Sequence, residues 1–337
     1  MVRVSLENRK NLKATDVLII GAGISGLLCA TKLREAGMSV RLLDKGRGVG
    51  GRMATRRMNC ARLDHGAQYF TVRDSQLQEF VNTWLDAGVI KEWFRHLPED
   101  SNPEGYPRYC GLRGMTDVPK HLAKDLDVCL CAEVTELMRE ADSWMVRTAS
   151  GDSFIARELV ITAPLPQALK LLDTMSHEYA IGNIEALREV SYERGLATLT
   201  ILDGPSGLPA PGGLKVHEAP LTWIADNQTK GISPDVSAIT IHANATFAEE
   251  HWDSHDDLRG KLMIEAALPF IQANIIEFNC HRWGFTTPIN PWSEKYFHND
   301  ELHLTLAGDS FGGARIEGAA LSGFAAASKV LESWSIC

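Results

Sequence analysis

Two glycine-rich turns near opposite ends of this 337-residue sequence carry the residue types that bind phosphates and cofactors. The first turn contains Gly21, Gly23 and Gly26 in the spacing Gly-x-Gly-x-x-Gly. There the first glycine permits a tight bend, the second lets the backbone approach a pyrophosphate, and the third lets a helix press on a strand. The second turn lies in LAGDSFGGARIEGAALSG, residues 306–323. Both turns therefore predict contact with a phosphate or a cofactor.

The elements around the first turn are those that a dinucleotide site needs. DVLII reads as an apolar strand, LLCATKLREAG as a helix that Gly37 ends, and SVRLLD as a second strand that ends at Asp44. In such a βαβ unit the N-terminus of the helix faces the phosphates, and the acidic residue accepts hydrogen bonds from the ribose hydroxyls. We therefore expect Gly21, Gly23, Ile24, Ser25, Gly26 and Asp44 to contact a nucleotide.

The residues after Asp44 indicate which nucleotide this is. An NAD dehydrogenase would proceed to its next helix, whereas this sequence continues KGRGVGGRM and later LDHGAQYF. Paired glycines permit close backbone approach, and an arginine can bind phosphate oxygens with two parallel hydrogen bonds. This pattern resembles the second fingerprint of flavoproteins of the glutathione-reductase-like and amine-oxidase-like superfamily, which implies FAD. The expected contacts in this segment are Lys45, Gly50, Gly51, Arg52, Ala67 and Gln68.

The segment 45–62 also holds six basic residues and no acidic one. Two interpretations stay open: a solvated loop with one FAD ligand, or an electropositive entrance for a phosphate-bearing substrate. The basic residues are Lys45, Arg47, Arg52, Arg56, Arg57 and Arg62.

Composition restricts the partners. The net charge of −9 argues against a nucleic-acid binder, and no apolar run approaches the roughly 18 residues that span a bilayer. Seven cysteines with no CxxC pair favour a reduced, cytoplasmic protein. His251 and His255 lack the glutamate of an HExxH motif, so we expect no metal site. Residues 1–13 are polar and predict a flexible N-terminal arm.

The second turn is explained by the same superfamily. There, a C-terminal strand ends in Gly-Asp, whose carboxylate binds the ribitol, and the next helix directs its N-terminus at the N1/O2 edge of the flavin. Gly308 and Asp309 match that pair, and Arg315, Ile316, Gly318 and Ala319 match the start of the helix. The partial positive charge of that helix would stabilise reduced flavin. The two turns are therefore expected to hold opposite ends of one FAD, non-covalently.

From Asp16 onward the sequence is similar to the renalase family, particularly its bacterial members. The resemblance rests on VLIIGAGISG, LLDKGRGVGGRM, LDHGAQYFTVRD, CGLRGM, ELVITAP, IHA, HRW and GDSFGGARIEGAALSG. It implies an α/β (α+β) fold like that of p-hydroxybenzoate hydroxylase, in which a mixed-sheet substrate domain is inserted into a Rossmann-like FAD-binding domain. The resemblance also places Val134 at the cofactor. We predict an FAD-binding domain from 14–74, 111–168 and 299–337, and a substrate domain from 75–110 and 169–298.

The resemblance further implies a reaction. Renalases oxidise isomers of NAD(P)H that carry the hydride at C2 or C6, restore NAD(P)+, and pass the electrons to O2, which becomes hydrogen peroxide. The presence of only one dinucleotide fingerprint is compatible with this activity. Hydride moves from carbon to flavin N5, so no side-chain base is obligatory and placement of the ring decides the rate. The expected partners are thus a small dinucleotide and O2.

Candidates for placing the ring follow from strand position and residue type. Tyr69, Phe70 and Thr71 come directly after the AQ pair, and His242 lies in the strand text ITIHA. Each of these could instead be an ordinary strand or core residue, as could the remaining candidates Trp283, Trp223 and Asn227.

Two other functions stay open. The first is an amine oxidase or desaturase, which would use a lysine near N5 and an aromatic cage. The second is a non-enzymatic, FAD-bound sensor, which would keep the cofactor site but need no open pocket.

Overall fold

The computed structural model describes residues 14–97, 105–140, 142–175 and 182–335. The predicted arm over residues 1–13 lies outside these ranges. Contacts divide the chain into two compact units. The first unit comprises 1–51, 122–191 and 290–337, and the second comprises 52–121 and 192–289.

The first unit is built on an eight-stranded mixed sheet, ordered β18-β19-β10-β1-β2-β7, which β9 and β8 extend from β10. Strands β19, β10, β1, β2 and β7 run parallel, whereas β18, β9 and β8 pair antiparallel. The strands are β1 (Thr15–Ile20), β2 (Val40–Leu43), β7 (Asp127–Cys129), β8 (Val134–Glu140), β9 (Ser143–Thr148), β10 (Ser153–Ile161), β18 (Phe297–Asn299) and β19 (Leu304–Leu306).

The strand order reverses between β1 and β10. The chain leaves β1 for β2 on one side, and it returns to β10 on the other side of β1. In open α/β sheets a ligand binds outside the carboxyl ends of the strands at such a reversal. A ligand site is therefore expected at the carboxyl ends of β1 and β10. The predicted βαβ unit is present, and β8, β9 and the first half of β10 form an antiparallel meander.

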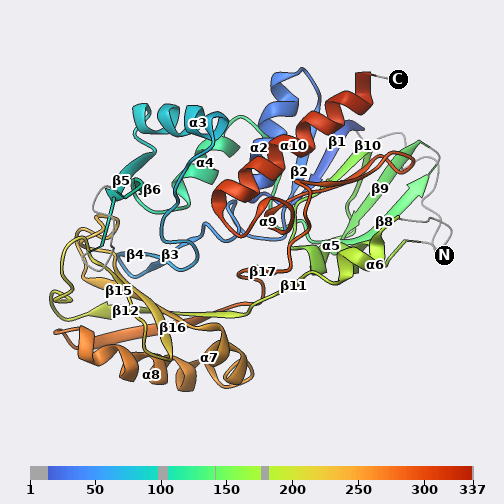
Figure 1. Cartoon of the computed structure of the whole chain (residues 1–337). Helices are drawn as coiled ribbons and strands as arrows, with labels where there is room; N and C mark the ends of the chain where they lie inside the picture. Colours follow the sequence, from blue (N-terminus) through green and yellow to red (C-terminus); the bar gives the residue numbers. More distant parts are fainter. Residues whose placement is uncertain (1–13, 98–104, 141, 176–181, 336–337) are drawn as a thin grey trace. The chain divides into compact units, whose positions relative to one another are not determined.

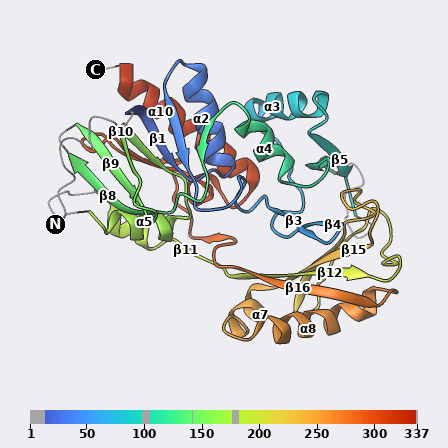
Figure 2. The same cartoon turned by 180° about the vertical axis from the view of Figure 1, so that it is seen from behind.

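Helices cover this sheet and explain its apolar strands. The parallel-paired residues 17–19 of β1, 42–43 of β2 and 159–161 of β10 are fully buried, as parallel strands with two covered faces require. Helices α2 and α10 lie together beside β1 and β2 (Figures 1 and 2). Their approach is close because Gly323 lacks a side chain: an added Cβ would lie 2.3 Å from the Ser25 carbonyl oxygen. The helices are α2 (Ile24–Glu35), α5 (Leu165–Leu172), α6 (Ile184–Arg188), α9 (Asp309–Gly312) and α10 (Ile316–Ser335).

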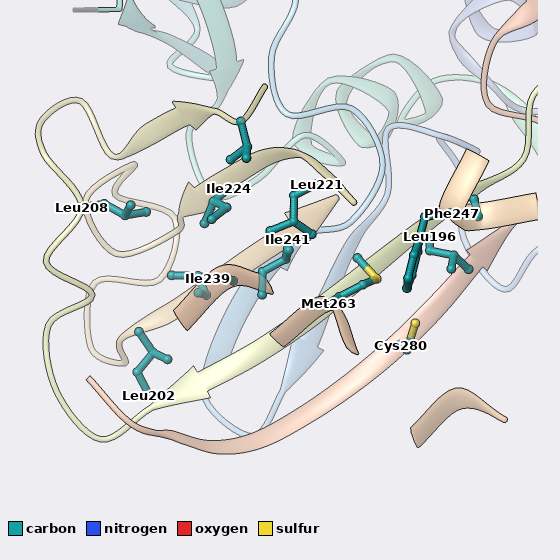
Figure 3. Packing of buried hydrophobic residues seen from close by; sticks show 13 residues of the cluster. Leu196, Leu202, Leu208, Leu221, Ile224, Ile239, Ile241, Phe247, Met263 and Cys280 are labelled. Atoms are coloured by element: carbon teal, nitrogen blue, oxygen red, sulfur yellow. The ribbon is translucent and has the colours of Figure 1, made fainter. Parts of the chain in front are cut away.

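The second unit contains a five-stranded antiparallel sheet, ordered β13-β14-β15-β12-β16. Helices α7 (Ala245–Glu250) and α8 (Asp256–Ala267) cover one face, and Leu196, Ile241 and Met263 lie in the apolar core beneath them (Figure 3). The strands are β12 (Gly195–Leu202), β13 (Gly213–Lys215), β14 (Leu221–Asp226), β15 (Ala238–Ala243) and β16 (Ile275–Trp283).

The opposite face of this sheet is covered in part by the hairpin of β3 (Thr55–Met58) and β4 (Ala61–Asp64). Leu63 of the hairpin packs with Leu199, Ile201 and Ala238 of the sheet. A second hairpin joins β5 (Ile90–Phe94) to β6 (Arg108–Gly111). The remaining elements are α3 (Ser75–Asp86), α4 (Asp117–Ala123), β11 (Ser191–Tyr192), η1 (Leu268–Phe270) and β17 (Pro288–Ile289).

The contact-based units and the predicted domains differ at their boundaries. Residues 52–74, predicted for the FAD-binding domain, group with the second unit because β3 and β4 pack on its sheet. Residues 169–191, predicted for the substrate domain, group with the first unit, where Thr174 Oγ1 accepts a hydrogen bond from the Leu137 amide. The functional assignment of each segment stays a prediction.

Candidate functional site

The first glycine turn closes tightly against the end of β10. Gly21 has a φ of 110°, and a Cβ added there would lie 2.7 Å from Thr162 Oγ1. A Cβ added at Gly26 would lie 2.1 Å from the Gly21 carbonyl oxygen. By contrast, nothing lies within 4 Å of a Cβ added at Gly23. The turn is thus packed on its protein side and open at its middle glycine, as a phosphate-binding turn needs to be.

The N-terminus of α2 has the features of an anion site. Gly23 is its N-cap and forms no side-chain capping bond, so the amides of the first turn face the open side. Ser25 is buried, and its hydroxyl finds no hydrogen-bond partner among the described residues. A buried hydroxyl without a partner is costly. These donors fit the pyrophosphate of a dinucleotide.

Asp44 at the end of β2 is held beside this turn. Its Oδ2 accepts from the Ala22 amide at 2.7 Å, and its Oδ1 accepts from the Gly46 amide at 2.7 Å. Each carboxylate oxygen can accept a second hydrogen bond. The arrangement is therefore compatible with the predicted ribose contact.

The paired glycines Gly50 and Gly51 pack against the first glycine turn. Gly50 donates its amide to the Ala22 carbonyl at 2.8 Å, and a Cβ added at Gly51 would lie 4.0 Å from Gly23 Cα. Lys45 and Val134 are the two remaining predicted cofactor contacts of the first unit. Lys45 follows Asp44 directly and is exposed, with its Nζ 3.3 Å from Gln167 Oε1. Val134 is half-buried and is the first residue of β8.

The second glycine turn and the first both pack against Thr162, the residue that follows β10. A Cβ added at Gly308, whose φ is 131°, would lie 3.5 Å from the Thr162 carbonyl oxygen. The Gly308 amide donates to Ser322 Oγ at 2.8 Å, and this bond ties the turn to α10. Asp309 is buried at the start of α9, a single turn that the sequence did not predict. Helix α10 begins at Ile316, as expected, so the two turns form one site in the first unit.

The other predicted cofactor contacts belong to the second unit. The Ala67 amide donates to the Arg52 carbonyl at 2.9 Å. The Arg52 guanidinium donates to the Thr286 carbonyl at 3.1 Å and lies 5.8 Å from the Tyr192 ring. The Gln68 side chain is buried and donates to the Asp64 carbonyl at 2.6 Å. In this structure the side chains of Arg52 and Gln68 thus bind protein groups, and their roles at FAD stay predictions.

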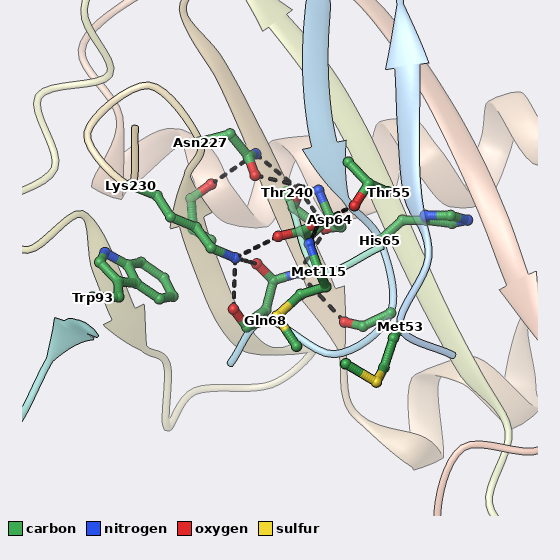
Figure 4. Close-up of polar contacts among 12 residues, drawn as sticks. Met53, Thr55, Asp64, His65, Gln68, Trp93, Met115, Asn227, Lys230 and Thr240 are labelled. Carbon is green, nitrogen blue, oxygen red and sulfur yellow. Dashed lines mark hydrogen bonds and ion pairs between the residues drawn. The ribbon is translucent and has the colours of Figure 1, made fainter. Parts of the chain in front are cut away.

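Sequence reasoning missed a buried ion pair beneath this segment (Figure 4). Lys230 Nζ donates to Asp64 Oδ2 at 2.8 Å and to the Gln68 carbonyl at 2.6 Å, and it lies 4.6 Å from the centre of the Trp93 ring. Both charged side chains are fully buried. Asp64 Oδ1 accepts from the Met115 amide and from Thr55 Oγ1. The pair therefore fixes the backbone of residues 64–68.

Asn227 belongs to the same network. Its Nδ2 donates to Thr240 Oγ1 at 3.0 Å, and its Oδ1 lies 3.4 Å from the Asp64 amide (Figure 4). The side chain is completely buried. The Asn227 side chain thus supports the Asp64 segment, and its predicted place in a pocket stays a prediction.

Four residues with ring side chains lie on the face of the five-stranded sheet that the β3–β4 hairpin covers in part. The strand register aligns Trp223, His242, Ala197 and His281 across β14, β15, β12 and β16. Trp283 lies two residues beyond His281 on the same face of β16. We call Trp223, His242, His281 and Trp283 the ring row. The structure thus brings together three of the predicted pocket residues.

His65 packs on the ring row from the end of β4. Its ring centre lies 4.7 Å from that of His281 and 5.1 Å from that of Trp283, and its carbonyl accepts from Trp283 Nε1 at 2.7 Å. Burial, with His281 nearby, lowers the pKa of His65 to about 3. Burial likewise lowers the pKa of His242 to about 4 and shifts the pKa of His281 downward. The row is therefore uncharged at neutral pH.

The three consecutive candidates after Gln68 have different surroundings. Tyr69 is half-buried in an aromatic cluster, with its ring centre 5.8 Å from that of Trp223. Phe70 packs against Trp84 and Tyr109, and it exchanges backbone hydrogen bonds with Tyr109. Phe70 is thus a core residue, and Thr71 is half-buried. Of the three, Tyr69 lies beside the ring row.

The basic hairpin offers cations near this face. Arg56 Nη1 lies 2.8 Å from Asn279 Oδ1, and its charge contributes to the low pKa of His65 and His281. Arg57 and Arg62 are directly opposite in the β3–β4 register, and no carboxylate of the described residues forms an ion pair with either. Like charges placed this way repel each other unless an anion lies between them.

His255 is the N-cap of α8, and in the described ranges no three His, Cys, Asp or Glu side chains gather as metal ligands would. Among the helices that the structure describes, none has the length and apolar character needed to cross a bilayer.

Comparisons with known proteins agree with this geometry. The model of the flavin containing amine oxidoreductase family matches residues 93–331, and that of the NAD(P)-binding Rossmann-like domain matches residues 19–84. Mouse (Mus musculus) renalase is 26% identical over 299 residues, which cover 83% of this chain and 87% of the renalase.

Solved structures show the same fold at low sequence identity. Putrescine oxidase bound to putrescine superposes with a TM-score of 0.71 at 13% identity, covering 95% of this chain and 99% of that one. Cyclohexylamine oxidase from Brevibacterium oxydans IH-35A also gives a TM-score of 0.71, at 14% identity and the same coverage. The predicted Rossmann-like fold is thus confirmed.

Proposed function

Because the chain belongs to the flavin containing amine oxidoreductase family and is a renalase-like, FAD-dependent oxidoreductase, we propose that it oxidises 2- and 6-dihydro isomers of NAD(P)H. The products are NAD(P)+ and, after reduction of O2, hydrogen peroxide. The observation that carries the proposal is the uncharged ring row, whose flat side chains suit a flat nitrogen heterocycle. Loss of hydride leaves a pyridinium cation, which neutral histidines do not repel.

The first unit supplies the residues that would hold FAD. The turn from Gly21 to Gly26 and the amides of α2 would bind the pyrophosphate, Asp44 the adenosine ribose, and Asp309 the ribitol. Bound FAD supplies a two-electron acceptor that takes hydride at N5 and passes the electrons to O2. The N-terminus of α10 would add a partial positive charge that favours the reduced form.

The second unit supplies residues for the substrate. Tyr69 and the ring row would bind the dihydropyridine by stacking and edge contacts, and Arg56, Arg57 and Arg62 would attract its phosphates. The hydride leaves from carbon, so these side chains act by placement and by excluding water rather than as bases. This assignment explains an uncharged ring row beside a basic hairpin.

The proposal is tested by anaerobic mixing with borohydride-reduced NAD+, which contains the 2-, 4- and 6-dihydro isomers. We expect a yellow protein whose flavin bleaches within the mixing time, and hydrogen peroxide in stoichiometric amount when O2 is admitted. Authentic 4-dihydro-NADH should bleach the flavin slowly, and monoamines should not bleach it. Absence of bleaching by the isomer mixture would remove the proposal and favour the sensor.

Amine oxidation is the second candidate, because an aromatic cluster and a buried lysine lie together. Tyr69, Trp93 and Trp223 contact one another, and Lys230 lies over the Trp93 ring. However, Lys230 already donates to Asp64 and to the Gln68 carbonyl. Bleaching by monoamines alone would favour this candidate over the first.

The proposal also includes the setting in which the enzyme works. FAD is held non-covalently, so acid precipitation should release all flavin into the supernatant. The cysteine pattern supports a reducing compartment, and we propose the cytoplasm, where nicotinamide dinucleotides and O2 are both present.

A further inference from the structure

Two arginines lie directly opposite each other on the β3–β4 hairpin. The register pairs Arg57 of β3 with Arg62 of β4, and we call these two residues the arginine pair. Side chains in opposite positions of an antiparallel ladder have Cβ atoms roughly 5 Å apart, so both guanidinium groups can reach one small anion. Like charges in opposite positions are unfavourable, and a bound anion would remove that cost.

The arginine pair lies on the face of the hairpin that is turned away from the five-stranded sheet. Met58 and Leu63 belong to the apolar cluster that joins the hairpin to this sheet. Arg57 precedes Met58, and Arg62 precedes Leu63, so the alternation of side chains along a strand places both arginines on the other face. Arg57 is exposed and Arg62 is half-buried, which leaves the pair accessible from solvent.

The charges of the arginine pair are not balanced by the hairpin itself. Asp64 is the only acidic residue of β3 and β4, and it is fully buried with its Oδ2 2.8 Å from Lys230 Nζ. Within the part of the chain that the structure describes, no group forms a hydrogen bond or an ion pair with Arg57 or Arg62. Each guanidinium therefore offers its N–H donors to an external acceptor.

The hairpin that carries the arginine pair is fixed on the sheet. Asn59, in the turn between β3 and β4, donates from Nδ2 to Glu277 Oε2 at 2.7 Å. Arg56, on the packed face, donates to Asn279 Oδ1 at 2.8 Å. Both acceptors belong to β16, so the turn and the strand before it are held on the sheet. A ligand therefore finds the backbone of the pair already in place, and only the side chains lose freedom on binding.

We propose that the arginine pair binds a terminal phosphate, and that its ligand is the 2′-phosphate of an NADP-type dinucleotide. A phosphate monoester carries about 1.5 to 2 negative charges at neutral pH, and its oxygens accept paired hydrogen bonds from guanidinium groups. Such a group matches two cations that face one side of a fixed hairpin. NAD lacks it, so the inference rests on the proposed function and names the dinucleotide whose dihydro isomers the enzyme prefers.

Equilibrium binding to the FAD-loaded, oxidised protein tests the pair without turnover. The probes are NADP+ and NAD+, which differ only in the 2′-phosphate. A hydrogen bond between charged groups contributes about a factor of ten or more in affinity. Wild-type protein should therefore bind NADP+ at least about tenfold more tightly than NAD+. If millimolar inorganic phosphate abolishes this preference at constant ionic strength, the pair binds free phosphate and the assignment to the nucleotide falls.

The variants separate binding from a structural role. Arg57→Gln and Arg62→Gln should each lose most of the preference for NADP+, and the double variant should bind both probes alike. Each single variant removes one of two like charges, so it should be at least as stable as wild type in urea unfolding. Lys261→Gln is the matched control, because it removes one exposed positive charge from α8, which covers the other face of the sheet. It should keep the full preference.

Two results would overturn the inference: equal affinity of wild-type protein for NADP+ and NAD+, or an undiminished preference in the double variant. Adenosine 2′,5′-bisphosphate and 5′-AMP, which lack nicotinamide, separate the inference from the proposed function. If the dihydro isomers fail to bleach the flavin while the bisphosphate binds more tightly than 5′-AMP in an Arg57-dependent way, the phosphate site stands and the proposed function falls. If isomers of both dinucleotides bleach the flavin while NADP+ and NAD+ bind alike, the proposed function stands and the inference falls.

Discussion

Replacing Lys230 with methionine should destabilise the second unit by several kcal/mol. Methionine keeps the length of the stem that packs near Trp93, but it removes the ammonium group between Asp64 and the Gln68 carbonyl. Asp64 is then left as a buried carboxylate whose Oδ2 has lost its cation. Breaking a buried ion pair in this way costs about 3 to 5 kcal/mol, because the remaining charge stays desolvated.

A second substitution isolates the charge from the lost hydrogen bonds. Asp64→Asn keeps an oxygen to accept from the Met115 amide and from Thr55 Oγ1, both of which bind Oδ1. The double variant Asp64→Asn/Lys230→Met contains no buried charge at this place. It should therefore lose only about 1 to 2 kcal/mol, the cost of the hydrogen bonds to the ammonium. The double variant is thus expected to be more stable than the single Lys230→Met.

Urea unfolding of the FAD-loaded protein, followed by far-ultraviolet circular dichroism, measures these differences. The double-mutant cycle should give a coupling energy of about 2 kcal/mol or more between the two side chains. The reasoning fails if Lys230→Met loses less than about 1 kcal/mol, or if the double variant is less stable than the single one.

Three further outcomes are expected. Gly26→Ala should yield colourless protein, because the added Cβ would lie 2.1 Å from the Gly21 carbonyl oxygen. Gly48→Ala is the control, since no atom lies within 4 Å of its added Cβ, and flavin absorbance at saturation should show that it binds FAD normally. Ser25→Ala removes a buried hydroxyl that has no partner within the described chain, so the apoprotein should be as stable as wild type or more stable. FAD should bind roughly tenfold more weakly in fluorescence titration, and undiminished affinity would contradict the role given to this hydroxyl. His65 is neutral in the folded state down to about pH 3 but takes up a proton near pH 6.5 when unfolded, so its contribution is complete above pH 6.5 and declines as the pH falls. His65→Gln should therefore flatten the slope of unfolding free energy between pH 6.5 and 4 by up to about 1.4 kcal/mol per pH unit, and an unchanged slope would refute the assignment.

The nucleotide-binding half of the site was predictable because its signals are local. The strand, the Gly21 to Gly26 turn and helix α2 follow one another within about twenty residues, and the end of β2 at Asp44 follows from the same periodicity. The Gly308 turn could be identified only through resemblance, since nothing local shows that it contacts Thr162.

The ion pair of Lys230 and Asp64 was not predictable, because its partners are 166 residues apart and neither lies in a distinctive pattern. The same applies to Trp223 and His242. Each was a candidate by residue type, but their adjacency depends on how β14 and β15 pair across the intervening loop. The contacts of Phe70 with Tyr109 and of Asn227 with Thr240 were not predictable either, because both join segments far apart in the sequence, and the pocket roles of these two residues stay predictions.

The sheet of the first unit places β1, from the beginning of the chain, near β19, from its end, with only β10 between them. A ribosome that adds about 5 to 20 residues per second emits β2 roughly 13 to 50 s before β19. During that interval the βαβ unit lacks α10, against which α2 is packed, and its apolar surface is exposed. Flavin capture must therefore wait until α10 has been synthesised, because only then are both glycine turns and the helix packed on α2 in place.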